Sequence, residues 1–287
     1  MVQSVIITGS SGFLGRNLAS RLAESQQTEL IQVNRENGFD LSVEGWTRKI
    51  PITQANIVFH FAQSNRRRDF PEGAEDVFRV NIASTFELLE WSRKHGVKRF
   101  IFASTGNVYK NYSEKMTEDS ACAPDTLYST SKFSAEKIVE SYSDFFEVIN
   151  TRIFGLYGPG QKDNLVSNIT KLIEEGHEIK LDGDKGLSLT PLFIEDAVEA
   201  FIKLSHLPLK NNKLTLNLAG DEVLSLLEIS KLISEITQKK FKFTKTKKTS
   251  KLFLGDNKLM KNLTGQKNLV SFKDGIRKTL LENLLNH

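Results

Sequence analysis

Hydrophobic residues follow two alternating periods along the first half of the chain. Short, largely apolar runs with the length and composition of strands lie at residues 5–8, 30–33, 56–61, 99–103 and 146–151. Between them, apolar residues recur every three or four positions. Leu14, Leu18 and Leu22 form the stripe of an amphipathic helix, and residues 75–95 and 128–142 are predicted to be helices as well. Strands separated by helices need crossover connections, so we expect an α/β fold with a doubly wound parallel sheet covered on both faces.

After about residue 159 the strand and helix patterns no longer alternate regularly. Short helices are predicted at residues 166–175, 195–204, 226–236 and 272–284, mixed with short strands. We therefore expect one domain over residues 1–160 and a smaller, mixed α/β lobe over residues 161–287, with some of the later chain crossing back to the sheet. A ligand is expected in the cleft between them, at the carboxyl ends of the strands.

Composition narrows the class of protein. The chain has 287 residues, of which 39% are hydrophobic and 26% charged, as in an ordinary soluble domain. It has neither a bilayer-length apolar run nor the start of a signal peptide, so no membrane insertion is expected. The single cysteine, Cys122, fits a reducing compartment, and a cytoplasmic location is predicted.

Charge adds less. The formal net charge of +4 is too diffuse to indicate a nucleic-acid partner. Residues 239–251 hold seven lysines and no acid, a run that ordinarily forms a solvated face, and Phe241 and Phe243 alternate with polar residues there as in a half-buried strand. No cluster of His, Cys and carboxylates has metal-ligand spacing, so no metal is expected. His60 in its apolar strand is interpreted as a core histidine, and the arginines at 66–68 as a solvated loop.

Three glycines follow the first strand directly. Gly9, Gly12 and Gly15 stand between a strand and a helix, which is the context in which such a motif binds a dinucleotide. The first glycine permits a sharp turn, the second lets a pyrophosphate approach, and the third lets helix and strand pack closely. The helix N-terminus adds free N–H groups and partial positive charge. This predicts a Rossmann-type domain that binds a nicotinamide dinucleotide.

The end of the second strand bears on which dinucleotide is bound. NAD usually meets an acid there, but the sequence places Asn34 and Arg35 at that point. Asparagine does not repel a 2′-phosphate, and a guanidinium can pair with one. NADP(H) is therefore favoured, with NAD(H) left possible.

A candidate for proton transfer lies at the start of a predicted helix, in the stretch YSTSK. Tyr128 and Lys132 are four residues apart and share one helical face. A phenol of pKa ~10 is a poor base at neutral pH, and a neighbouring ammonium lowers its pKa. Ser104 and Thr105, directly after a predicted strand, offer a hydroxyl donor.

Together these motifs resemble the extended short-chain dehydrogenase/reductases, in particular the NAD(P)-dependent epimerase/dehydratase family that acts on nucleotide-activated sugars. The resemblance runs almost end to end. It is carried by TGSSGFLG (8–15), VFHFAQ (58–63), Asn81, STGNVY (104–109), P-x-x-x-Y-S-T-S-K-x-x-x-E (124–136), TRIFGLYGPGQ (151–161), FIEDAVEA (193–200) and D-x-K (256–258). It implies a Rossmann-type domain with a C-terminal substrate lobe, a nucleotide-diphosphate sugar as substrate, and often a homodimer formed through two sheet-covering helices.

The resemblance also assigns roles to residues. It makes Tyr128 the acid/base, Lys132 the group that lowers the tyrosine's pKa and holds the nicotinamide ribose, and Thr105, four residues before Tyr109, the donor to the reacting sugar oxygen. The implied cofactor-binding residues are Gly9, Ser11, Gly12, Phe13, Leu14, Gly15, Asn34, Arg35, Asp40, Leu41, Phe61, Ala62, Gln63, Asn81, Tyr128, Lys132 and Ile153. The implied substrate-binding residues are Ser64, Thr105, Asn107, Gly155, Asn164, Leu165 and Lys245.

Departures from the family pattern narrow the reaction. Dehydratases and decarboxylases have an acid where this chain has Asn107, and an amide cannot serve as general acid or base. What remains is 4-keto reduction or 4-epimerisation. Because a reductase consumes NADPH at each turnover, Arg35 favours reduction, with a 4-epimerase that recycles its cofactor as the alternative. A non-catalytic cofactor sensor or nucleic-acid-binding protein is a remote third, since it would have little reason to keep Thr105, Tyr128 and Lys132 together.

Two further departures concern substrate contacts. Leu189 stands where the family commonly has an arginine that grips the diphosphate, and Gly155 replaces a common asparagine. Lys245, Lys247 or Lys248 is expected to take over phosphate binding.

Overall fold

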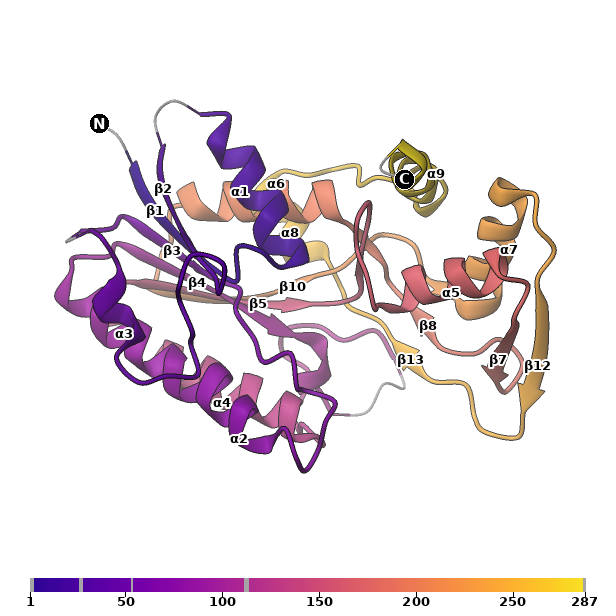
Figure 1. Cartoon of the computed structure of the whole chain (residues 1–287), viewed down its shortest axis with the longest axis horizontal. Coiled ribbons are helices and arrows are strands. Elements are labelled where there is room, and N and C mark those ends of the chain that lie inside the picture. Colours follow the sequence, from indigo (N-terminus) through magenta and orange to yellow (C-terminus); the bar gives the residue numbers. More distant parts are fainter. Residues whose placement is uncertain (1–2, 26–27, 53, 111–113, 286–287) are drawn as a thin grey trace. The chain divides into compact units, whose positions relative to one another are not determined.

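A six-stranded sheet combines five strands that lie before residue 154 with one later strand (Figure 1). The computed structural model describes residues 3–25, 28–52, 54–110 and 114–285. The sheet has the order β10-β5-β4-β3-β1-β2, built from β1 (Gln3–Thr8), β2 (Thr28–Val33), β3 (Ile57–His60), β4 (Arg99–Thr105), β5 (Glu147–Ile153) and β10 (Lys213–Leu218). β1 is parallel to β2 and β3, and β3 is parallel to β4. The predicted doubly wound α/β fold is confirmed, and its switch point lies at the carboxyl ends of β1 and β3.

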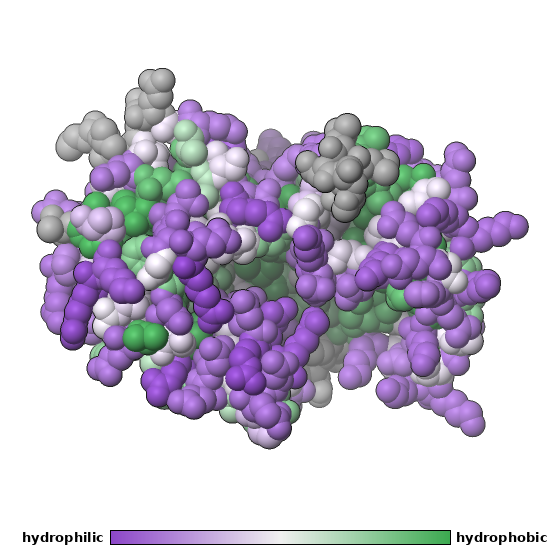
Figure 2. Space-filling view, in the orientation of Figure 1, coloured by the Kyte–Doolittle hydropathy of each residue, from purple (hydrophilic) through white to green (hydrophobic). Residues whose placement is uncertain are grey.

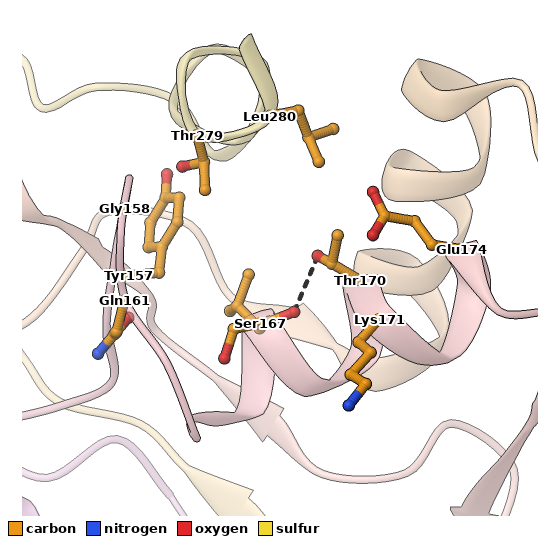
Figure 3. Close-up of a pocket in the computed structure, with 10 residues that line it drawn as sticks. Tyr157, Gly158, Gln161, Ser167, Thr170, Lys171, Glu174, Thr279 and Leu280 are labelled. Atoms are coloured by element: carbon orange, nitrogen blue, oxygen red, sulfur yellow. Dashed lines mark hydrogen bonds between the residues drawn. The ribbon is translucent and has the colours of Figure 1, made fainter. Parts of the chain in front are cut away.

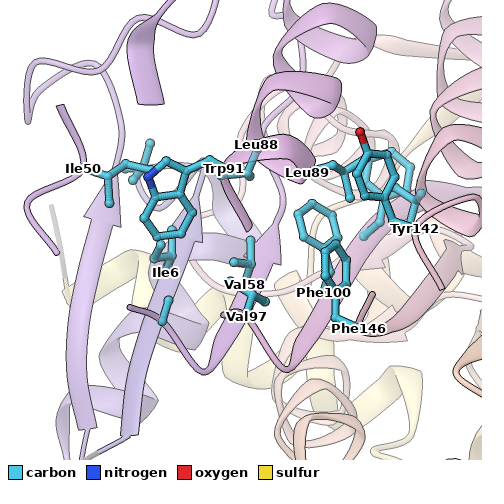
Figure 4. Packing of buried hydrophobic residues seen from close by; sticks show 14 of the residues in the cluster. Ile6, Ile50, Val58, Leu88, Leu89, Trp91, Val97, Phe100, Tyr142 and Phe146 are labelled. Carbon is cyan, nitrogen blue, oxygen red and sulfur yellow. The ribbon is translucent and has the colours of Figure 1, made fainter. Parts of the chain in front are cut away.

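Apolar residues in register across the strands form the core beneath the helices. Ile6 pairs with Val58, and Val58 with Phe100. These residues belong to one cluster with Leu88 and Leu89 of α3 (Ser84–Lys94), shown in Figure 4. Residues next to them in the strands point to the opposite face, where the Phe59 ring meets the Phe201 ring. Strands buried on both faces are what a parallel sheet requires.

The helix predicted over residues 75–95 is interrupted in the structure. It consists of α2 (Ala74–Phe78), a π-helical segment η2 (Arg79–Ala83) and α3. The hydroxyls of Ser84 and Thr85 donate to the carbonyls of Val80 and Asn81, four residues earlier. Such bonds compete with the regular backbone ladder, which accounts for the irregular turn. The other helical segments of this part are α1 (Phe13–Ala23), η1 (Trp46–Lys49), η3 (Gly106–Val108) and α4 (Leu127–Glu140).

Residue contacts divide the chain into two compact units. The first comprises Met1–Lys110, Ala121–Arg152 and Phe201–Leu216, and the second comprises Asn111–Ser120, Ile153–Ala200 and Asn217–His287. The remaining elements are β6 (Leu156–Tyr157), α5 (Leu165–Glu174), β7 (Glu178–Asp182), β8 (Ser188–Leu189), β9 (Leu192–Phe193), α6 (Ile194–His206), β11 (Leu224–Ser225), α7 (Leu226–Thr237), β12 (Lys242–Thr246), β13 (Leu252–Phe253), α8 (Lys258–Thr264) and α9 (Phe272–Leu285). The strands after residue 155, apart from β10, form three small sheets, β11-β8-β13, β12-β7 and β6-β9. Together with the helices they make the later part of the chain mixed α/β, as predicted.

The lysine-rich segment forms a strand but is less buried than its pattern predicts. β12 pairs in parallel with β7, yet Phe243 is 42% exposed. In a two-stranded sheet, alternation sets which way side chains point but does not supply a layer to bury them. The face seen in Figure 2 is mostly hydrophilic, with hydrophobic residues in separate small patches. Within the described residues, no helix is both long and apolar enough to cross a membrane.

Candidate functional site

Gly9, Gly12 and Gly15 form the turn after β1, which we call the glycine cradle. A side chain at Gly9 or Gly15 would collide with neighbouring backbone atoms. Gly9 has a φ of 68°, and a Cβ on it would lie 2.8 Å from the Ala62 nitrogen. A Cβ on Gly15 would overlap the Gly9 carbonyl, so α1 packs directly on the turn. Around Gly12 a Cβ would meet only the Gly9 carbonyl, at 3.1 Å, and no side chain caps the helix that begins after it. This open approach to a helix N-terminus fits a pyrophosphate.

The end of β2 is tied to this cradle. The buried Asn34 donates from Nδ2 to Ser10 Oγ at 2.8 Å and accepts from the Asn37 amide. The Arg35 side chain is 61% exposed, and its Nε lies 3.9 Å from Asp40 Oδ1. Hydrogen bonds from Ser42, together with the charge of Arg35, lower the pKa of Asp40. Leu41 packs, partly buried, against the hydrophobic core.

Tyr128 and Lys132 project from the first two turns of α4. A reciprocal cap between Thr126 and Ser129 fixes where this helix begins. The Tyr128 hydroxyl donates to Gln63 Oε1 at 3.0 Å. Lys132 is only 2% exposed, and its Nζ lies 4.1 Å from the centroid of the Phe102 ring. Burial lowers the Lys132 pKa to about 7, against the opposing charge of Glu136.

The electrostatics of the Tyr128 phenol involve a residue that sequence reasoning missed. Burial raises the Tyr128 pKa, while the charge of Arg67 and a hydrogen bond with Thr105 lower it. The expected action of Lys132 on this pKa stays a prediction. Arg67 was assigned to a solvated loop. The only feature of the sequence that favours a role for Arg67 at the site is its place in an arginine run just after a strand that ends there.

Thr105 ends β4 within hydrogen-bonding range of the tyrosine. Its Oγ1 accepts from the Asn107 amide at 3.2 Å and from Asn107 Nδ2 at 3.1 Å. The neighbouring Ser104 hydroxyl is buried and has no hydrogen-bond partner among the described residues. Thr105, Tyr128 and Gln63 are therefore brought together at the carboxyl ends of the strands, where a reacting group would sit.

His60 is a core histidine, as expected, and a hydrogen-bond chain fixes its tautomer. Its Nδ1 lies 2.6 Å from Thr8 Oγ1, and its Nε2 lies 2.8 Å from Thr85 Oγ1. Because Thr85 donates to the Asn81 carbonyl, it must accept from Nε2–H, so Nδ1 accepts from Thr8. The neutral ring thus joins β1, β3 and α3.

We expect this buried histidine to make the protein sensitive to acid. Burial, and then the charge of Lys132, lower the His60 pKa from 6.5 to about 3. Between these values the unfolded chain binds a proton that the folded chain does not, so stability falls as the pH falls. At ~1.4 kcal/mol per pKa unit, the loss is about 3–5 kcal/mol by pH 3. Urea unfolding at pH 7, 5, 4 and 3 measures it.

His60→Gln is the matched control because glutamine does not ionise. We expect it to be less stable at pH 7 but to show a shallower decline with acid. Equal pH slopes for the two proteins would show that His60 is not the titrating group.

Other predicted residues of this unit hold the loop that follows β3. Ser64 is buried, donates its amide to Asn81 Oδ1 at 2.8 Å and bonds the Asp76 carboxylate through its hydroxyl. Asn81 also donates to Ser131 Oγ at 2.9 Å, which links η2 to α4. Of the remaining candidates, Leu14 is buried, Phe13, Phe61, Ala62 and Ile153 are half-buried, and Ser11 and Gln63 are exposed.

The predicted residues of the second unit already have structural roles. Asn164 caps α5 by accepting from the Ser167 amide at 2.9 Å, and Leu165 follows it, half-buried. Lys245 Nζ lies 2.7 Å from Asp184 Oδ1. Gly155 has a φ of 66°, and a Cβ there would lie 3.2 Å from Leu189 Cδ1. The Leu189 side chain, one departure from the family pattern, therefore lies next to the space that a side chain at position 155, the other departure, would enter.

A separate cavity of about 240 Å³ lies within the second unit, between α5 and α9 (Figure 3). The hydroxyls of its two threonines already donate hydrogen bonds to the backbone. Thr170 donates to the Val166 carbonyl, and Thr279 donates to the Gly275 carbonyl. None of the predicted site residues lines it. No group of His, Cys, Asp and Glu residues that could hold a metal ion occurs in the described part of the chain.

Comparison with known proteins agrees with the fold described above. Residues 5–219 match the sequence model of the NAD dependent epimerase/dehydratase family. A UDP-glucose epimerase of Bacillus subtilis, itself uncharacterised, is 24% identical over 82% of this chain and 83% of its own length. A probable UDP-glucuronate 4-epimerase of Rhizobium meliloti is 26% identical over 71% and 68%. The crystal structure of a Bacillus cereus UDP-glucuronic acid 4-epimerase, in complex with UDP-glucuronic acid and NAD, superposes with a TM-score of 0.84 over 99% of this chain and 100% of its own, at 20% identity.

Proposed function

Because this chain belongs to the NAD-dependent epimerase/dehydratase family, we propose that it is a nucleotide-sugar 4-epimerase. The observation that carries the proposal is the Tyr128 phenol beside Thr105, with Asn107 rather than an acid next to them. One group that exchanges a proton is enough for chemistry at a single carbon, whereas elimination needs a second. The similar proteins named as UDP-glucose and UDP-glucuronate epimerases support the same reaction class.

The residues of the site would have different roles in this reaction. The glycine cradle and the N-terminus of α1 would hold the pyrophosphate of a nicotinamide dinucleotide. A bound nicotinamide dinucleotide would supply reversible hydride transfer at the sugar carbon. Tyr128 takes the proton of the 4-hydroxyl and returns it, and Thr105 orients that oxygen. Gln63 Oε1 accepts a hydrogen bond from the Tyr128 hydroxyl at 3.0 Å and would hold this hydroxyl in place until substrate replaces the amide.

A second candidate is the 4-keto reduction first expected from the sequence, and one observation favours it. Arg35 is 61% exposed beside the end of β2 and can meet a 2′-phosphate. NADP(H) is therefore proposed alongside NAD(H). Reduction takes second place because two similar proteins, those of Bacillus subtilis and Rhizobium meliloti, are named as epimerases. The identity of the phosphate-binding lysine, the domain boundary at residue 160 and the cytoplasmic location stay predictions.

We also propose that the protein is a homodimer formed through α3 and α4. Phe86 on α3 is 52% exposed, and Phe145, just after α4, is 60% exposed. The Arg93 guanidinium of α3 lies 5.5 Å from the Phe145 ring centroid, so α3 contacts the turn that follows α4. Exposed apolar patches commonly mark association sites. A monomeric mass in light scattering would refute the proposal.

One experiment separates the two reactions. The protein is incubated with UDP-glucose, UDP-glucuronic acid and a panel of 4-keto nucleotide sugars, each with NAD⁺, NADH, NADP⁺ or NADPH. An epimerase interconverts an ordinary nucleotide sugar with no net change in absorbance of the reduced cofactor. Consumption of NADPH in proportion to a 4-keto sugar would reverse our order of the two candidates. A Thr105→Val variant is the control and should lose either activity.

A further inference from the structure

The guanidinium of Arg67 lies against the reactive ring of the proposed site. Its Cζ is 5.9 Å from the centroid of the Tyr128 ring, within the range of cation–π contacts. The three consecutive arginines differ in their surroundings: Arg66 and Arg68 are exposed, whereas Arg67 is half-buried. Arg66 Nε lies 3.5 Å from an Asp69 carboxylate oxygen. Arg67 has no ion-pair partner among the described residues, so its charge is left to act on the phenol.

The loop that carries Arg67 is held at several points. Ser64 anchors it through the bonds to Asn81 and Asp76, and the Arg66 amide donates to Ser64 Oγ at 3.1 Å. Gly73 closes the loop so tightly that a Cβ there would lie 2.5 Å from the Arg66 carbonyl oxygen. A loop fixed by these contacts holds Arg67 over the ring and limits its freedom to turn into solvent.

The charged groups near the phenol in this unit are few. Lys132, one turn along α4, is buried and its pKa is lowered to about 7, so it is only partly charged at neutral pH. Its neighbour Glu136 is paired with Arg152, and His60 is neutral. Gln63 and Thr105, which bond the hydroxyl, carry no charge. Guanidinium groups, by contrast, stay charged in proteins.

We propose that Arg67 is a positioning residue for Tyr128, whose fixed positive charge favours the deprotonated phenol that the proposed reaction requires. The inference rests on the proposed function for its role in turnover. The predicted effect of Arg67 on the pKa of Tyr128 does not depend on the proposed function. The 5.9 Å separation joins Arg67 Cζ to the centre of the ring, over which part of the phenolate charge is spread. Unit charges at such separations, with an effective dielectric constant between that of a protein surface and that of water, move a pKa by roughly 0.5–2 units.

The first test needs no substrate. The protein is labelled with 3-fluorotyrosine, which lowers the pKa of the phenol into an accessible range, and the ¹⁹F shift of each of the five tyrosines is followed against pH. The Tyr128→Phe variant identifies the signal. Arg67→Met should raise the apparent pKa of this signal by about 0.5–2 units, whereas Arg67→Lys should preserve it. Arg68→Met, an equal loss of charge in the same loop, is the matched control and should leave it unchanged.

The second test uses turnover of whichever substrate the panel identifies. Arg67→Met should shift the acidic limb of the kcat profile to higher pH by the same amount, with Arg67→Lys restoring it. A rise in KM without a shift of the profile would overturn the proposal, as would an unmoved ¹⁹F titration. If no panel substrate reacts, the proposed function fails while the ¹⁹F result still decides the role of Arg67.

Discussion

Replacing Tyr128 by phenylalanine is expected to lower turnover about 10²–10⁴-fold while leaving cofactor affinity nearly unchanged. The substitution removes only the hydroxyl that donates to Gln63 and lies beside Thr105. General acid–base catalysis by a positioned side chain accounts for rate effects of this size. The glycine cradle, formed by Gly9, Gly12 and Gly15, is not altered. Turnover of the reactive nucleotide sugar and a fluorescence titration with the dinucleotide measure the two effects separately.

Tyr142→Phe is the matched control for this loss. Its hydroxyl donates to Glu90 Oε1 at 2.8 Å, outside the proposed site, so turnover should be retained. If Tyr128→Phe keeps more than a tenth of the activity, Tyr128 is not the proton-transfer group. Loss of dinucleotide binding together with activity would instead indicate a damaged fold.

Replacing Arg152 by methionine is expected to destabilise the protein by about 3–5 kcal/mol, because it leaves a buried carboxylate without its main partner. Arg152 Nε and Nη2 contact both oxygens of Glu136 at 2.8–3.2 Å. The Glu136 side chain is fully buried and that of Arg152 is 6% exposed. The pair joins β5 to α4 one turn beyond Lys132, so the site should loosen as well. Urea unfolding at pH 7 measures the stability.

The double variant Arg152→Met with Glu136→Gln isolates the cause. With the carboxylate neutralised, we expect much of the lost stability to return. Arg79→Met is the control: its exposed pair with Glu75, at 3.0 Å, should contribute at most about 0.5 kcal/mol. A loss of less than 1 kcal/mol in Arg152→Met would contradict the importance of the buried pair.

Local features of the fold could be predicted because they depend on neighbours in the chain. The five predicted strands of the sheet occur, with ends differing by a few residues, and Gly9 adopts the positive φ that a sharp turn needs. The exceptions have different causes. The break of the 75–95 helix is accompanied by local hydroxyl bonds from Ser84 and Thr85 to carbonyls four residues earlier, whereas the exposure of Phe243 depends on what covers β12.

The candidate site could be predicted in part for the same reason. Tyr128 and Lys132 share a face of α4 because helical spacing alone decides it. By contrast, the sequence does not show that Ser64 is buried as a loop anchor. Nor does it show that the Leu189 side chain borders the space beside Gly155. Each of these facts depends on residues that packing brings together.

The amino-acid sequence by itself determined the α/β architecture, the glycine cradle and the tyrosine–lysine face, since backbone conformation and helical period are set within a few residues. Only the tertiary structure decided which charges surround the phenol. Arg67 and Tyr128 are 61 positions apart in the chain, and their contact depends on how the loop after β3 folds against α4. Electrostatic influence follows distance in space, which no local pattern of residues records.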